Sequence, residues 1–170
     1  SGRVTLSHPD LETLELDPDT DGARLIDWAG GLIPENRAQS ARVVLATEQA
    51  WTDTPFPSIS LCSLSSLNAL SDRVGQPLDP RRFRINFWVD GFEPWSEFEW
   101  LGHTLQIGDL TFEAKDRITR CKSTMANPDT GLRDADTLGA LESWGHTDFG
   151  ITLLAKDTGK LKVGNSVVLS

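Results

Sequence analysis

Turn-forming residues divide this chain into short segments, and that division constrains its fold more than any other feature. Fourteen glycines, together with prolines and aspartates, separate short runs in which apolar and polar residues alternate. Such alternation predicts β-strands at residues 4–6, 11–16, 41–46, 59–61, 105–107, 110–114, 150–154 and 160–169. Gly108-Asp109 is a dipeptide typical of a hairpin turn. Helical spacing is limited to residues 25–28, 64–73 and 137–144, and Ser63 is the expected N-cap of the second helix, with Gly75 at its exit.

Many short strands and few short helices predict a mostly β fold, either a barrel or a sandwich decorated by helices. The chain has 170 residues, of which 38% are hydrophobic. This is enough for one compact domain with a substantial core.

A basic stretch at residues 82–89 predicts one more strand. Polar residues at every second position alternate with apolar ones: Arg82, Arg84 and Asn86 against Phe83, Ile85, Phe87 and Val89. A strand would place the guanidinium and amide groups on one face. Paired guanidinium groups suit a phosphate, and an amide suits a heterocycle. The alternative is a solvated face paired with acidic residues.

A second basic run, residues 115–122, contains Cys121. Arg120 and Lys122 flank this cysteine, and nearby cations favour the thiolate, which is a nucleophile and a soft metal ligand. The alternative is that Cys121 is a small buried residue of a strand. Cys62 lies in an uncharged run, so we expect it to be buried. The positive charge around Cys121 predicts a small anionic ligand.

The formal net charge of −9 argues against nucleic acid and anionic membranes as partners. No apolar run approaches the roughly twenty residues of a membrane span, and no signal-peptide pattern opens the chain, so we expect a cytoplasmic protein. The two cysteines form neither a zinc motif nor a disulfide framework, and the three histidines are far apart in the sequence. P-loop, dinucleotide-binding and nucleophile-elbow motifs are missing from the sequence.

An ordered series of motifs resembles the MOSC domain, named after the C-terminal part of molybdenum cofactor sulfurase. The series comprises residues 82–86 (RFRIN), 95–102 (WSEFEWLG), 105–108 (LQIG), 120–121 (RC), 127–131 (NPDTG), 138–141, 149–150 and 159–165 (GKLKVGN). Residues 52–56 and 59–70 are also similar to the branch that includes the mitochondrial amidoxime-reducing component and its bacterial relatives. The resemblance covers roughly residues 52–169.

The resemblance implies a MOSC-like β-barrel with a few short peripheral α-helices. Residues 1–50 would be N-terminal strands and loops, a remnant of a MOSC N-terminal region, and residues 51–170 the MOSC domain. The resemblance also implies a molybdenum cofactor, a molybdopterin, whose metal is bound by Cys121. Residues at the Arg84 and Asn86 positions would help hold its phosphate and pterin.

We assign three further basic or polar residues to the same cofactor: Arg82, Thr119 and Arg120. Asp53, on a loop bounded by proline, is expected to be a catalytic residue that faces the substrate, the alternative being an ordinary turn aspartate. No lysine suits a Schiff base, so pyridoxal phosphate is not expected.

The function implied is that of a molybdenum-dependent oxidoreductase that reduces N-hydroxylated or N-oxygenated small molecules with electrons from a donor protein. One alternative is a noncatalytic carrier of the cofactor, or of sulfur as a persulfide on Cys121. Another is a structural domain that has lost its ligand. The sequence departs from the family because no Lys-Ser or Lys-Ala element precedes Ala41, and because Ile85 and Asn165 stand where relatives carry Pro and Asp.

Overall fold

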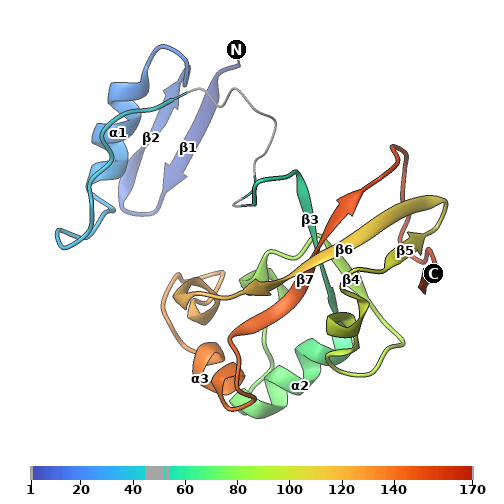
Figure 1. Cartoon of the computed structure of the whole chain (residues 1–170). Coiled ribbons are helices and arrows are strands. Elements are labelled where there is room, and N and C mark those ends of the chain that lie inside the picture. Colours follow the sequence, from blue (N-terminus) through green and yellow to red (C-terminus); the bar gives the residue numbers. More distant parts are fainter. Residues whose placement is uncertain (1, 45–51, 53, 170) are drawn as a thin grey trace. The chain divides into compact units, whose positions relative to one another are not determined.

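The computed structural model describes residues 2–44, 52 and 54–169. The chain divides into two compact units, Ser1–Gln49 and Ala50–Ser170 (Figure 1).

The first unit is an antiparallel strand pair followed by a helix. β1 (Val4–His8) pairs with β2 (Leu11–Leu16), and α1 spans Gly22–Gly30. The indole Nε1 of Trp28 on α1 donates to the carbonyl of Glu12 on β2 over 2.6 Å.

The strand expected at residues 41–46 is not formed at residues 41–44, which are exposed and lie in no strand. Residues 45 and 46 lie outside the described residues. Alternation alone does not form a strand without a neighbouring strand to pair with.

The second unit is built on a curled sheet whose six strands, within the described residues, run in the order β4-β3-β7-β6-β5-β8 (Figure 1). The strands are β3 (Ser58–Ser63), β4 (Phe87–Val89), β5 (Thr104–Ile107), β6 (Leu110–Thr119), β7 (Asp148–Ala155) and β8 (Val167–Leu169). β3 and β4 run parallel, and all other neighbours are antiparallel. The mostly β, barrel-like prediction is confirmed, although the strand expected at 160–169 is limited to β8.

Short helices connect these strands. α2 (Leu64–Val74) begins after Ser63, whose hydroxyl accepts the Ser66 N–H, and ends at Gly75 with a left-handed φ of 83°, so the predicted caps are confirmed. α3 spans Thr137–Glu142, and three 3-10 helices are η1 (Pro80–Phe83), η2 (Ser96–Trp100) and η3 (Lys122–Met125). None of the helices in the described part of the chain combines the length and apolar character that a bilayer crossing requires.

Two apolar clusters form the core of the second unit. One lies between strands and includes Leu61, Phe112 and Ile151, and the other lies beneath α2 and α3 and includes Leu70 and Phe149. Fully burying one such side chain stabilises the fold by about 1.5–3 kcal/mol. Both clusters include residues of β7, the strand that pairs with β6 next to the candidate site.

Residues 82–86 do not form the expected strand. Asp79 caps η1 by accepting the Arg81 N–H over 2.8 Å, and Pro80 occupies the first helical position, so the chain turns instead of extending. Arg84 then adopts a left-handed φ of 53°, and β4 begins only at Phe87. The three polar residues therefore share no strand face: Arg82 is buried, whereas Arg84 and Asn86 are exposed.

Candidate functional site

Cys121 is exposed, two residues past the end of β6 and at the N-cap of η3. Its Sγ lies 3.1 Å from the hydroxyl oxygen of Ser123. Hydrogen bonding by the Ser123 side chain and backbone, with a smaller contribution from the charge of Arg120, lowers the pKa of the Cys121 thiol. The thiol is therefore accessible and predisposed to ionise, and the alternative of a buried strand residue does not apply.

Ser123, which contacts the Cys121 thiol, is not among the site residues predicted from the sequence. The flanking cations were expected to favour the thiolate, but the hydroxyl two residues after the cysteine acts most strongly on its pKa. A serine at this spacing is a recognisable signal, because short hydroxyl side chains commonly bond to groups two residues away. Cys62 behaves as expected: it is buried, and burial followed by the nearby Glu97 carboxylate raises its pKa.

Arg84 and Asn86 lie on the turn between η1 and β4. Within the described residues, the guanidinium of Arg84 has no hydrogen-bond or ion-pair partner, and its backbone carbonyl accepts a bond from the Ser60 hydroxyl over 3.4 Å. The side-chain oxygen of Asn86 accepts from the N–H and the hydroxyl of Ser60, both over 2.9 Å. Asn86 is thereby oriented with its oxygen toward β3, and among the described residues nothing accepts from its side-chain N–H₂.

Ser60 is a second residue that the sequence analysis missed. Its hydroxyl also accepts the backbone N–H of Asn86 over 3.0 Å, so one side chain on β3 holds the whole turn. Because 26 residues separate Ser60 from Asn86, no local pattern in the sequence indicates this contact.

Arg120 donates all of its described hydrogen bonds to backbone carbonyls. Its Nε and Nη2 lie 2.8 and 2.6 Å from the Phe149 oxygen, and Nη1 lies 2.9 Å from the Phe83 oxygen. Burial lowers the pKa of Arg120 to about 10, while the two cysteines act in the opposite direction. No carboxylate among the described residues neutralises this guanidinium.

Arg82 and Thr119 also bond to protein groups. Arg82 Nη2 lies 2.6 Å from an oxygen of Asp134, and Nη1 lies 3.1 Å from the Met125 carbonyl. The Thr119 hydroxyl donates to Asp148 over 2.7 Å.

The predicted site residues thus form two groups: the side chains of Arg82, Thr119 and Arg120 are engaged with the protein, whereas those of Cys121 and Arg84 are accessible. Asp53 lies outside the described residues.

The structure brings the two basic runs together. The Phe83 carbonyl that accepts from Arg120 precedes Arg84, and Arg120 precedes Cys121, so one guanidinium connects the two segments. Among the described residues, no group of three or more His, Cys, Asp and Glu side chains could hold a metal ion. Within the described residues, Cys121 therefore belongs to no protein-only metal site.

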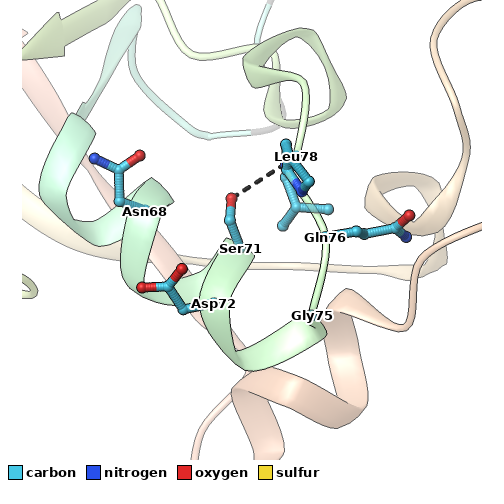
Figure 2. Close-up of a pocket in the computed structure, with 7 residues that line it drawn as sticks. Asn68, Ser71, Asp72, Gly75, Gln76 and Leu78 are labelled. Atoms are coloured by element: carbon cyan, nitrogen blue, oxygen red, sulfur yellow. Dashed lines mark hydrogen bonds between the residues drawn. The ribbon is translucent and has the colours of Figure 1, made fainter.

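Two surface clefts among the described residues differ in their relation to the predicted site residues. A cleft of about 760 Å³ between β4 and residues 161–167 includes Asn86 in its lining. Another, of about 510 Å³, lies at the C-terminal end of α2 and is shown in Figure 2, where the Ser71 hydroxyl accepts the Leu78 N–H. Asn68, Asp72 and Gln76 line this second cleft, which includes no predicted site residue.

The sequence is similar to those of several known proteins. The family model of the MOSC domain matches residues 52–168. The chain is 29% identical over 161 residues to human mitochondrial amidoxime-reducing component 1, covering 86% of this chain and 46% of that protein. It is 33% identical over 111 residues to the molybdenum cofactor sulfurase of Oryza sativa subsp. japonica, covering 58% of this chain and 13% of that protein.

Among solved structures, YiiM from Geobacillus stearothermophilus matches with a TM-score of 0.49 and 18% identity, covering 66% of this chain and 53% of that one. The chain spans about half the length of the amidoxime-reducing component that it matches. Because the family model covers more than half of the sequence, this chain belongs to the MOSC domain family.

Proposed function

We propose that this chain binds a molybdenum cofactor at Cys121 and reduces N-oxygenated small molecules. The observation that carries the proposal is the exposed Cys121 thiol with a lowered pKa, beside a guanidinium that no described carboxylate neutralises. A buried cation without a counter-ion favours an anion nearby. The Cys121 thiolate together with an anionic cofactor would supply the negative charge that this cation favours.

The donor set fits a phosphorylated, metal-bearing cofactor. In this assignment Cys121 holds the metal as its thiolate, Arg84 binds the phosphate and Asn86 donates its N–H₂ to the pterin. The Ser123 hydrogen bond favours the thiolate form of Cys121, and Ser60 keeps the Asn86 amide oriented. Asp53 is retained as a residue that faces the substrate.

When bound, the cofactor would supply two-electron redox chemistry coupled to removal of oxygen from an N–O group. The electrons would come from a donor protein. Because the chain spans about half of the amidoxime-reducing component, the activity of that whole protein is carried over here as part of the proposal.

Reduction of an amidoxime by the purified chain, with reduced methyl viologen as an artificial electron donor, tests the proposal. The wild-type chain isolated from cells grown with molybdate should reduce the amidoxime, and Cys121→Ser should lose this activity. Cys62→Ser is the matched control, because the serine hydroxyl can donate to Glu97 in place of the thiol. Activity of Cys121→Ser equal to that of the wild type would refute the assignment.

A second candidate function is sulfur transfer, supported by the accessibility of Cys121 and by the similarity to molybdenum cofactor sulfurase. The Cys121 thiolate would attack the outer sulfur of a donor persulfide, and the donor thiolate would leave. Mass spectrometry after incubation with a cysteine desulfurase should then show one added sulfur on Cys121. An unchanged mass would remove this candidate.

A further inference from the structure

Two arginines, Arg82 buried and Arg120 half-buried, reach across the candidate site in opposite directions. Arg82 extends from η1 to the segment after Cys121, where it bonds to the Met125 carbonyl and to Asp134. Arg120, immediately before Cys121, extends back to η1, where it bonds to the Phe83 carbonyl. The segment that carries Cys121 is therefore attached to η1 on both sides of the thiol.

Burial makes these attachments difficult to exchange for water. The Arg82 side chain is only 5% exposed, and the Phe83 ring packs on the Phe149 ring with a centroid distance of 4.2 Å. Arg120 bonds to the backbone carbonyls of both phenylalanines. Removing either guanidinium would leave buried carbonyl oxygens without a donor, and buried unsatisfied groups are costly.

The backbone of Arg84 explains what the attachments hold in place. Its φ of 53° is a left-handed conformation that a residue with a side chain adopts only under constraint. The Arg84 N–H donates to the Arg81 carbonyl over 3.3 Å, and the preceding carbonyl, that of Phe83, is held by Arg120. In this conformation Arg84 is exposed while the adjacent Phe83 is buried.

We propose that Arg82 and Arg120 are positioning residues, a reciprocal pair that fixes the Arg84 turn relative to Cys121. Both guanidinium groups donate their hydrogen bonds to the protein, so neither donates one to the cofactor, and Arg120 acts on it only through its charge. This proposal changes the roles expected from the sequence. The pair sets the span between the group that binds phosphate and the thiolate that binds metal. This inference rests on the proposed function, because that function requires both groups to engage one ligand.

Hydrogen–deuterium exchange of the whole chain tests the geometry without any cofactor. Arg120→Met and Arg82→Met should each accelerate exchange in peptides covering residues 83–86 and 121–126 by about tenfold or more, while the peptide of β5, which neither arginine contacts, keeps its protection. Arg117→Met, on β6, is the control, because this arginine is exposed and its guanidinium lies over the Phe98 ring, away from both segments. It should leave those peptides unchanged.

Uniform acceleration across the sheet, or no acceleration at 83–86, would overturn the proposal. If Arg120→Met does not fold, Arg120→Lys serves instead, because one ammonium can reach only one of the two carbonyls. Arg120→Lys should give intermediate exchange at residues 83–86, and exchange equal to that of the wild type would overturn the proposal.

The cofactor content separates this inference from the proposed function. Arg82→Met and Arg120→Met should copurify with at most about a tenth of the wild-type molybdenum and pterin although Cys121 and Arg84 are intact. Wild-type content in both variants would overturn the positioning role. Absence of both components from the wild-type chain would refute the proposed function, and the exchange pattern would still decide whether the pair fixes the turn.

Discussion

At the scale of single residues, the environments of the two cysteines separate a reactive thiol from an inert one. Cys121 is exposed and its pKa is lowered, mainly by Ser123, whereas burial raises the pKa of Cys62. Only the thiolate reacts with alkylating agents. Native protein should therefore be alkylated at Cys121 and not at Cys62.

Ser123→Ala should raise the pKa of Cys121, because the hydroxyl hydrogen bond stabilises the thiolate. At a pH below that pKa, the rate of iodoacetamide labelling should fall about three- to tenfold, the range expected for the loss of one hydrogen bond. Mass spectrometry across a pH series gives both the labelling rate and the pH at which that rate is half-maximal, which is the midpoint of the Cys121 titration.

Lys122→Met is the control for this series, since Lys122 flanks the cysteine but is not among the causes of its lowered pKa. Its midpoint should match that of the wild type. A midpoint shifted by Lys122→Met but not by Ser123→Ala would support the simpler expectation from the sequence, in which flanking cations act on the thiol.

At the scale of secondary-structure elements, a buried carboxylate joins η2 to the start of α2. Glu97 is fully buried and accepts from Cys62 Sγ over 3.2 Å, from the Ser63 hydroxyl over 3.2 Å and from the Ser66 hydroxyl over 3.0 Å. The Ser66 hydroxyl also accepts the N–H of Trp95, whose φ of 67° is left-handed. Glu97 therefore supports both a helix cap and a constrained turn.

Glu97→Ala should lower the free energy of unfolding by about 3 kcal/mol or more, because it leaves several buried donors unpaired. Urea denaturation measures this loss. Glu99→Ala, on the exposed side of η2, should change stability by less than about 0.5 kcal/mol. Equal effects for the two variants would contradict the structural role given to Glu97.

Gly150 on β7 shows why the sheet requires glycine at one point. Its φ is 77°, and a Cβ at this position would lie 2.7 Å from the Leu61 carbonyl oxygen on β3. Gly150→Ala should therefore destabilise the protein by about 3 kcal/mol or more.

Gly145→Ala is the matched control, since Gly145 has a φ of 84° and no atom within 4 Å of the added carbon. It should lose only about 1–2 kcal/mol from backbone strain. Thermal denaturation of both variants separates the cost of the contact with the Leu61 oxygen from the cost of backbone strain. Equal losses of stability in the two variants would contradict the role of that contact.

Local sequence signals predicted those elements that local interactions determine. Ser63 and Gly75 bound α2, and Gly108-Asp109 turns the hairpin between β5 and β6, as their sequence positions indicated. The strand expected at 82–89 forms only at 87–89, because a proline and a capping aspartate outweigh the alternation before it. Contacts such as Ser60 with Asn86 connect distant segments, so no local pattern contains them.

At the scale of the whole molecule, the core clusters of the second unit draw only on residues from 59 onward. The matched family segment, residues 52–168, includes all of these residues. A fragment spanning residues 52–170 should therefore fold cooperatively, with a Tm within about 5 °C of that of the whole chain. Differential scanning calorimetry measures the Tm of the fragment and of the whole chain. A fragment without a cooperative transition would contradict the prediction that this core folds without residues 1–51.

The measurement that tests the central claim most directly is the molybdenum and pterin content of the chain purified from cells grown with molybdate. Elemental analysis and pterin fluorescence should find both components in the wild type and in Cys62→Ser. Cys121→Ser should retain roughly a tenth or less of the molybdenum, because the thiolate is the proposed protein ligand to the metal. Wild-type molybdenum content in Cys121→Ser would contradict the account.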